Sequence, residues 1–240
     1  MKTQNKASTK KGEAVRLIAV AQVKGGSGRS TLATNLAGEL SKRATTVLID
    51  ADLPQATCSS WYALRGPLNK PGGLRIDTAA NHRELTDKIN HWAGELAVGP
   101  GFIIVDGPPR IAEISRAMVL LADLVLIPAG ASLADLWATG DILAMVKDAK
   151  AINPAIQARL VLTRYRRFTN QAKTLAEQAG AELGVKGLKT TMGLRVAYPE
   201  ALGSGVTVAE LADKQAKAEL AALLAEVHGI MKYLHTYIRS

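Results

Sequence analysis

The chain has 240 residues, of which 48% are hydrophobic and only 4% aromatic, and it carries a formal net charge of +9. That length suits one large domain, and the composition suits an α/β core while excluding extensive disorder. The single cysteine, Cys58, excludes an internal disulfide framework and favours a reducing compartment. Because every apolar run is shorter than the roughly 20 residues that span a bilayer, and the N-terminus is polar rather than signal-like, we expect a cytoplasmic protein.

The excess of Lys and Arg indicates a polyanionic partner. Such an excess attracts nucleic acid or an anionic membrane surface over long range. The charge is spread along the chain, so a merely soluble basic protein is the alternative. Residues 1–14 hold four lysines among small polar residues. This pattern predicts a basic flexible tail ahead of a single domain over residues 15–240.

A glycine-rich loop, residues 23–31, lies between an apolar run and a helical pattern. Leu17–Ala21 predicts a buried parallel strand, and Leu32–Leu40 carries apolar residues at helical spacing. In that setting the backbone N–H groups of the loop and the helix N-terminus favour a bound polyphosphate, with Ser30 as a hydroxyl ligand of Mg²⁺ and Thr31 as a further phosphate contact. An ordinary glycine-rich turn is the alternative, because the general pattern G-x-x-x-x-G-K-[ST] is not satisfied. The predicted nucleotide-binding residues are Lys24, Gly25, Gly26, Ser27, Gly28, Arg29, Ser30 and Thr31.

The next apolar segment, Thr45–Asp52, predicts a strand that ends in two carboxylates, Asp50 and Asp52. In open α/β sheets the ligand lies beyond the carboxyl ends of the strands. We therefore expect both carboxylates to face Mg²⁺ and the γ-phosphate. A pair of turn-forming aspartates is the alternative.

A third buried strand, Phe102–Asp106, follows a predicted short edge strand, Leu74–Asp77, and an amphipathic helix, His82–Leu96. The third strand delivers one carboxylate at its end and is followed by Gly-Pro-Pro, which cannot continue it. A carboxylate in that position can hold Mg²⁺ through water, as in the Walker B arrangement. Asp106 is therefore the third predicted metal-site residue, beside Ser30 and Asp50.

The rest of the chain continues the alternation of strands and helices. The predicted elements are a helix closing at 118–122, a strand at Leu124–Pro128, a helix from Ala131 to about Ala149, a strand at Arg159–Arg164, a helix at Thr169–Leu183 and a last helix at Val208–Ile238. This order predicts an α/β protein with a mostly parallel, doubly wound sheet, helices on both faces and no second domain. The apolar end of the last helix could bind a membrane surface, but a helix packed on the sheet is the preferred interpretation.

Several motifs resemble those of one family. The loop sequence KGGSGRST resembles the deviant phosphate loop of the ParA/MinD group of ATPases, usually written KGGxGK[ST]. The residues around Asp52 resemble the DxDPQ motif of ParA proteins, with one extra residue at Leu53, and Asp-Gly-Pro-Pro resembles the signature DxPP. The segments Ala131–Thr139 and Thr190–Ala201 resemble two later ParA motifs, the first of which lies at the dimer interface in that family.

The resemblance, which runs from about Leu17 to Leu211, implies a P-loop ATPase similar to the short ParA proteins. In that family the early lysine, here Lys24, reaches across a homodimer to the partner's nucleotide, and Asp52 orients the attacking water. The implied cycle uses ATP and Mg²⁺, dimerisation, nonspecific DNA binding on the nucleoid, and hydrolysis stimulated by a ParB-like adaptor, so that plasmid or chromosomal cargo is segregated. The alternatives are a MinD-like membrane-associated regulator and a nucleotide switch that scarcely hydrolyses ATP.

DNA contact is expected from basic residues that dimerisation brings onto one surface. The candidates are Arg164, Arg166, Arg167, Arg195, Lys214 and Lys217. For the residues near Arg164, an exposed charged turn is the alternative.

Arg29 departs from the family pattern, which has lysine at this position of the loop. The resemblance implies that the residue at this position is catalytic, together with Lys24 and Asp52. Arginine is longer, planar and forked, so the exchange is not conservative. We expect nucleotide binding to persist but turnover to be slow, because a misplacement of about 1 Å can cost roughly 100-fold. On this account Arg29→Lys speeds hydrolysis. The alternative is a loop adapted to arginine, in which the lysine variant is slower.

Overall fold

The computed structural model describes residues 15–66, 73–130, 132–165 and 184–237. The predicted tail of residues 1–14, the predicted helix Thr169–Leu183, and the candidate DNA contacts Arg166 and Arg167 lie outside these residues.

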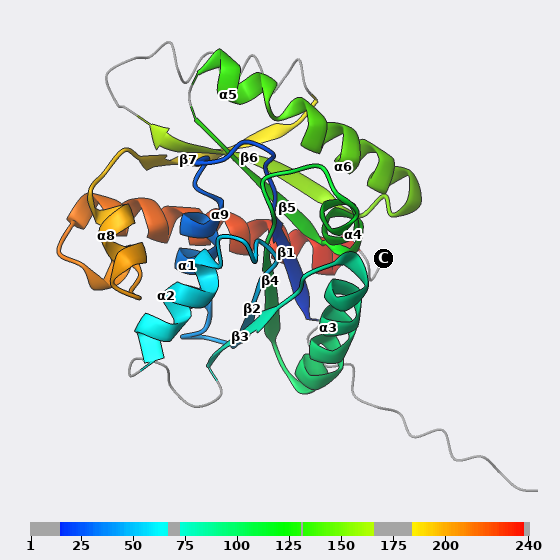
Figure 1. Cartoon of the computed structure of the whole chain (residues 1–240), viewed down its shortest axis with the longest axis horizontal. Helices are drawn as coiled ribbons and strands as arrows, with labels where there is room; N and C mark the ends of the chain where they lie inside the picture. Colours follow the sequence, from blue (N-terminus) through cyan, green and yellow to red (C-terminus); the bar gives the residue numbers. More distant parts are fainter. Residues whose placement is uncertain (1–14, 67–72, 131, 166–183, 238–240) are drawn as a thin grey trace, which may run out of the picture.

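A seven-stranded parallel sheet in the order β3-β2-β4-β1-β5-β6-β7 forms the centre of the molecule (Figure 1). In β1, Leu17 and Ala19 belong to the hydrophobic core on one face, whereas Ile18 and Val20 belong to the core on the other face. A strand buried on both faces needs a continuous apolar run, which is the pattern that predicted it. The strands are β1 (Arg16–Val20), β2 (Thr45–Asp50), β3 (Leu74–Thr78), β4 (Gly101–Asp106), β5 (Leu124–Ala129), β6 (Gln157–Tyr165) and β7 (Lys186–Gly193).

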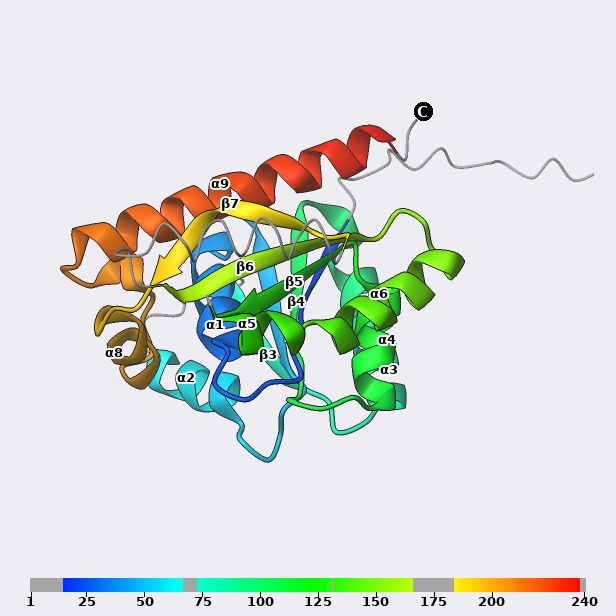
Figure 2. The ribbon, with the colours of Figure 1, turned by 90° about the horizontal axis from the view of Figure 1, so that it is seen from above.

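Helices cover both faces of the sheet (Figure 2). One core packs the sheet against α1, α2, α8 and α9, and the other packs it against α3, α4 and α6. The predicted doubly wound α/β class is therefore confirmed. The helical elements are α1 (Arg29–Leu40), α2 (Thr57–Arg65), α3 (His82–Glu95), η2 (Leu96–Val98), α4 (Glu113–Leu121), α5 (Leu133–Trp137), α6 (Gly140–Ile152), α8 (Ala197–Gly203), η3 (Val208–Glu210) and α9 (Lys214–Tyr237).

Two predicted helices are wrong in their extent. The helix expected from Ala131 to about Ala149 is divided into α5 and α6, because Thr139 closes α5 in a tight turn: its N–H and its hydroxyl both donate to the Leu136 carbonyl, at 2.9 and 2.5 Å. The helix expected from Val208 begins instead at Lys214, where the Asp213 carboxylate accepts the N–H groups of Gln215 and Ala216.

The edge strand β7 was not predicted, because its two large apolar residues, Leu188 and Met192, are separated by polar residues instead of forming a run. It packs against α9, whose carboxylates accept backbone N–H groups of the strand: Glu226 bonds those of Lys189 and Thr190, and Glu219 bonds that of Gly193. Lys189 and Thr190 lie where the pairing of β7 with β6 is irregular, so side chains of α9 satisfy donors that the ladder leaves unpaired.

Candidate nucleotide-binding site

The glycine-rich loop joins β1 to α1 at the carboxyl edge of the sheet. Gly26 and Gly28 have φ angles of 70° and 92°, in the left-handed region where a side chain adds strain. The end of β6 holds the loop from outside, because the Thr163 hydroxyl donates to the Ser27 carbonyl at 2.7 Å and the Arg164 guanidinium donates to the Gly26 carbonyl at 3.2 Å. Arg164 itself has a φ of 54°, an uncommon value that marks a sharp bend at this end of β6.

The N-terminus of α1 is suited to an anion. Its N-cap residue is Gly28, and no side chain caps the first turn. The first N–H groups of a helix lack intrahelical partners, and their dipole favours negative charge. Loop and helix together therefore fit the predicted polyphosphate.

Lys24 lies on the surface, with 44% of its side chain exposed, and its ammonium pairs with the Asp135 carboxylate of α5. Asp135 also accepts the Ser132 hydroxyl, and the Ser132 hydroxyl oxygen accepts the Asp135 N–H at 3.1 Å, so Ser132 is the N-cap of α5. Partial burial acts to raise the pKa of Asp135, but Lys24 and Ser132 outweigh it and lower that pKa. Asp135 was not predicted as a site residue.

Arg29 lies beneath the loop and is nearly buried. Its Nε donates to the Gly107 carbonyl at 2.9 Å, and its Nη1 donates to the Gln22 and Lys24 carbonyls at 2.8 and 2.9 Å. Its Nη2 lies 3.5 Å from Oδ2 of Asp52.

Asp106 is fully buried at the end of β4. Its Oδ2 accepts the Cys58 thiol at 3.1 Å, whereas its Oδ1 has no hydrogen-bond partner among the described residues. Burial raises the pKa of Asp106 to about 6, against the opposing effects of the Ser30 hydroxyl, the Cys58 thiol and Arg29. Burial and the neighbouring carboxylates raise the pKa of Cys58, so this residue remains a thiol that can donate. Cys58 thus contacts a site carboxylate.

Asp50 differs from Asp106 in that both of its oxygens are engaged. Oδ2 accepts the N–H and hydroxyl of Ser59, both at 2.9 Å, and Oδ1 accepts the Asp52 N–H at 3.2 Å. The described part of the chain contains no group of three or more His, Cys, Asp or Glu residues that could hold a metal ion by itself. Mg²⁺ usually needs only one or two protein oxygens beside substrate phosphates and water. The Ser30 hydroxyl and the unpartnered Asp106 oxygen fit that requirement better than Asp50 does.

Two of the described candidate DNA-binding residues make side-chain contacts within the chain. Arg164 contacts the phosphate loop, and Arg195 pairs with Glu219 of α9 at 2.6 Å. Lys214 and Lys217 are exposed in the first turn of α9. Arg164 is exposed as well, but its guanidinium donates to the phosphate loop, so we take the two lysines as the candidates to test.

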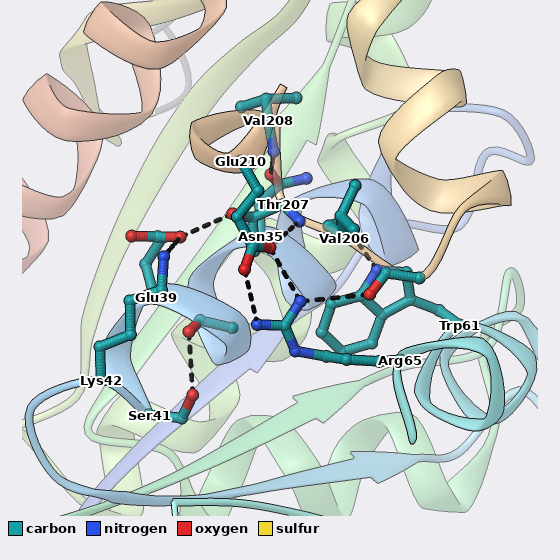
Figure 3. Close-up of polar contacts among 12 residues, drawn as sticks. Asn35, Glu39, Ser41, Lys42, Trp61, Arg65, Val206, Thr207, Val208 and Glu210 are labelled. Carbon is teal, nitrogen blue, oxygen red and sulfur yellow. Dashed lines mark hydrogen bonds and ion pairs between the residues drawn. The ribbon is translucent and has the colours of Figure 1, made fainter. Parts of the chain in front are cut away.

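A polar network supports α1 and α2 behind the site (Figure 3). The Arg65 guanidinium forms a two-pronged pair with Glu210, at 2.8 and 3.0 Å, and the Trp61 indole donates to the Val206 carbonyl at 2.9 Å. Asn35 and Glu39 of α1 accept hydrogen bonds from the Val208 N–H and the Thr207 hydroxyl. The segment 205–210 thus joins the helix after the phosphate loop to the helix after Asp52.

We expect Glu210→Gln to destabilise the fold by about 1–3 kcal/mol at neutral pH, because it leaves the buried Arg65 charge poorly paired. Partial burial acts to raise the pKa of Glu210, but Arg65 and the Thr207 N–H outweigh it and lower that pKa to about 2. A lowered folded-state pKa stabilises the protein above the unfolded value of about 4.5, and the stabilisation is lost as the pH falls toward about 2. Urea unfolding between pH 7 and pH 3 should therefore show a smaller pH dependence in the variant.

Glu113→Gln is the matched control, because its side chain is 80% exposed and its carboxylate pairs with the surface residue His82. It should change stability by less than about 0.5 kcal/mol. Equal losses in the two variants would contradict a stabilising role for the Arg65–Glu210 pair.

A parallel sheet with a glycine-rich loop after β1 and a carboxylate at the end of β4 defines a P-loop nucleotide-binding protein. The family model described as the CobQ/CobB/MinD/ParA nucleotide binding domain matches residues 18–208, so the chain belongs to this family. It is a P-loop ATPase of the ParA/MinD group, for which the predicted ligands are ATP and Mg²⁺, and the sequence resemblance is confirmed at this level.

Known relatives span nearly the whole domain. A "Maintenance of carboxysome distribution protein A" from Halothiobacillus neapolitanus is 32% identical over 215 residues, covering 88% of this chain and 95% of the relative. The "Chromosome-partitioning ATPase Soj" of Thermus thermophilus is 26% identical over 238 residues, covering 88% and 94%. An ATP complex of a Cyanothece McdA variant has a TM-score of 0.73 at 18% identity, covering 91% of this chain and 98% of that structure. Among the described helices, none has the length and apolarity needed to cross a membrane.

Proposed function

We propose that this protein is an ATP-driven positioning ATPase that forms a homodimer on ATP and binds DNA without sequence preference, and that an adaptor comparable to ParB couples it to a cargo. The observation that carries this proposal is Lys24, an exposed lysine at the start of a glycine-rich loop, whose contact in the single chain is a surface pair with Asp135. The exposure of this side chain supports the proposal that it reaches a second copy.

Each site residue has a separate role in this proposal. The loop N–H groups bind the phosphates, and the Ser30 hydroxyl and Asp106 hold Mg²⁺. When bound, Mg²⁺ neutralises charge that develops on the β- and γ-phosphate oxygens. Asp52 orients the attacking water, and Lys24 meets the phosphates bound by the partner subunit.

The nature of the cargo follows from the relatives and not from the site. The names of two relatives refer to carboxysome distribution and to chromosome partitioning. We favour a protein body such as the carboxysome over a plasmid or chromosome, because the carboxysome protein has the higher identity at similar coverage. Neighbouring genes test this choice: genes for a protein-shelled body support it, and a gene for a centromere-binding protein supports DNA segregation on the nucleoid.

We expect the ATP-bound protein to retain duplex DNA of any sequence, with an affinity that falls linearly with salt on a double-logarithmic plot. Replacing Lys214 and Lys217 by Glu should weaken binding and, if each meets one phosphate, lower the salt slope by about 2. The measurement is a DNA shift across a salt series with ATP and with ADP.

The matched control replaces Lys147 and Lys150, two exposed lysines of α6 on the other face of the sheet, by Glu. It changes the net charge equally and should leave the slope near that of the wild type. Equal losses in both double variants would show a dependence on net charge alone. ATP-dependent retention on anionic liposomes without a DNA shift would instead support the MinD-like membrane alternative.

A further inference from the structure

Most N–H groups of the Arg29 guanidinium donate hydrogen bonds to backbone carbonyls. Nε and Nη1 donate to three carbonyls that belong to different segments: Gln22 after β1, Lys24 in the loop, and Gly107 after β4. A guanidinium has five N–H donors in a rigid fork. Three of them are therefore occupied, and the two that remain are on Nη2.

Nη2 lies on the side of Asp52, 3.5 Å from its carboxylate, and the side chains of the two residues are only 7% and 8% exposed. The backbone of Asp52 is held separately, because its N–H donates to Asp50 and its carbonyl accepts the N–H groups of Gln55 and Ala56 at 3.0 and 2.8 Å. Arg29 thus adds a restraint on the carboxylate to a backbone that is already fixed.

We infer that Arg29 is a positioning residue that braces the phosphate loop from beneath and orients the Asp52 carboxylate, rather than a ligand of the phosphates. This inference rests on the proposed function, in which Asp52 orients the attacking water. The phosphate charge is then met by the loop N–H groups, the α1 N-terminus and Lys24.

Lysine cannot reproduce this arrangement. Its ammonium carries three donors on one atom at the end of a flexible stem, whereas the three carbonyls and Asp52 surround a planar group. Arg29→Lys therefore loosens Asp52. We expect single-turnover hydrolysis to fall about 10- to 100-fold, the range set by a displacement of about 1 Å, while ATP affinity changes less than about threefold. The account of Arg29 as a misfit phosphate ligand requires the opposite result, a faster lysine variant.

The test is a double-mutant cycle between Arg29→Lys and Asp52→Asn, with ATP affinity and single-turnover hydrolysis measured separately. If Arg29 acts through Asp52, the lysine substitution slows hydrolysis in the wild type and has little further effect in Asp52→Asn. Arg43→Lys, the same exchange at an exposed position, is the matched control and should change neither quantity.

Three results would overturn the inference: faster hydrolysis in Arg29→Lys, a loss of ATP affinity beyond about tenfold, or full additivity with Asp52→Asn. If the lysine variant does not fold, NMR of the wild-type guanidinium gives the answer. Slowly exchanging Arg29 Nε–H and Nη signals in the nucleotide-free protein support the brace, and rapid exchange contradicts it. A wild type that binds no ATP would refute the proposed function itself, which is a distinct outcome.

Discussion

Lys24→Ala should remain monomeric with ATP at concentrations where the wild type dimerises. In the proposed dimer, Lys24 of each subunit meets the phosphates bound by the other, so its removal leaves desolvated negative charge without a partner. Truncating one member of a buried charge pair at an interface costs about 2–5 kcal/mol or more. Light scattering with ATP and with ADP measures the effect.

The pair between Lys24 and Asp135 adds a second expectation. In the single chain Asp135 holds the Lys24 ammonium, so this contact must open before Lys24 can reach the partner's phosphates. Asp135→Asn removes the competing charge and keeps the size of the side chain. It should therefore preserve ATP-dependent dimerisation or strengthen it.

Lys42 is a closely matched control. It lies just after the C-terminus of α1, at the end of this helix opposite the phosphate loop. Its side chain is 45% exposed, against 44% for Lys24, and it too pairs with one carboxylate, Glu39. Lys42→Ala should dimerise like the wild type. Normal dimerisation of Lys24→Ala would refute the assignment of this loop as a deviant phosphate loop.

The central strands could be predicted from the sequence because burial on both faces demands continuous apolar runs. Leu124–Pro128 and Phe102–Asp106 match β5 and β4 for this reason. Strand β7 lacks such a run, and several of its backbone N–H groups are bonded by Glu219 and Glu226, which lie on a helix 26 to 37 residues further along the chain. Sequence periodicity carries no information about such partners.

The candidate site likewise combines features that the local sequence predicts with contacts from residues distant in the sequence. The loop and the carboxylates at strand ends could be recognised locally, since each follows directly from a strand or precedes a helix. The residues that hold them belong to distant segments: Asp135, in α5 after β5, lies 111 positions from Lys24, and Thr163, in β6, lies 136 positions from Ser27. Only the sheet order, with β5 beside β1 and β6 beside β5, brings these residues together.

Asp52→Ala should bind ATP and dimerise but lose turnover by about 10²- to 10⁴-fold, the usual contribution of a group that positions or accepts a proton in the transition state. The substitution leaves the loop N–H groups, Ser30 and Asp106 in place, so the affinity for ATP should stay within a few-fold of the wild-type value. Asp52→Asn, which keeps the shape of the side chain, should lose nearly as much turnover, because the amide carries no negative charge to orient the water. Single-turnover hydrolysis and equilibrium binding measure the two effects separately.

Asp106→Asn should behave differently from Asp52→Ala. It changes the predicted metal ligand, a carboxylate whose Oδ1 has no hydrogen-bond partner among the described residues. Its main defect should be weaker Mg²⁺-dependent nucleotide binding, partly recovered at high Mg²⁺, whereas added Mg²⁺ should not restore Asp52→Ala. Asp148→Asn, at an exposed position on α6, should leave both quantities unchanged. Wild-type hydrolysis by Asp52→Ala would remove Asp52 from the mechanism, and recovery of Asp52→Ala by Mg²⁺ would make it a metal ligand instead of a residue that orients water.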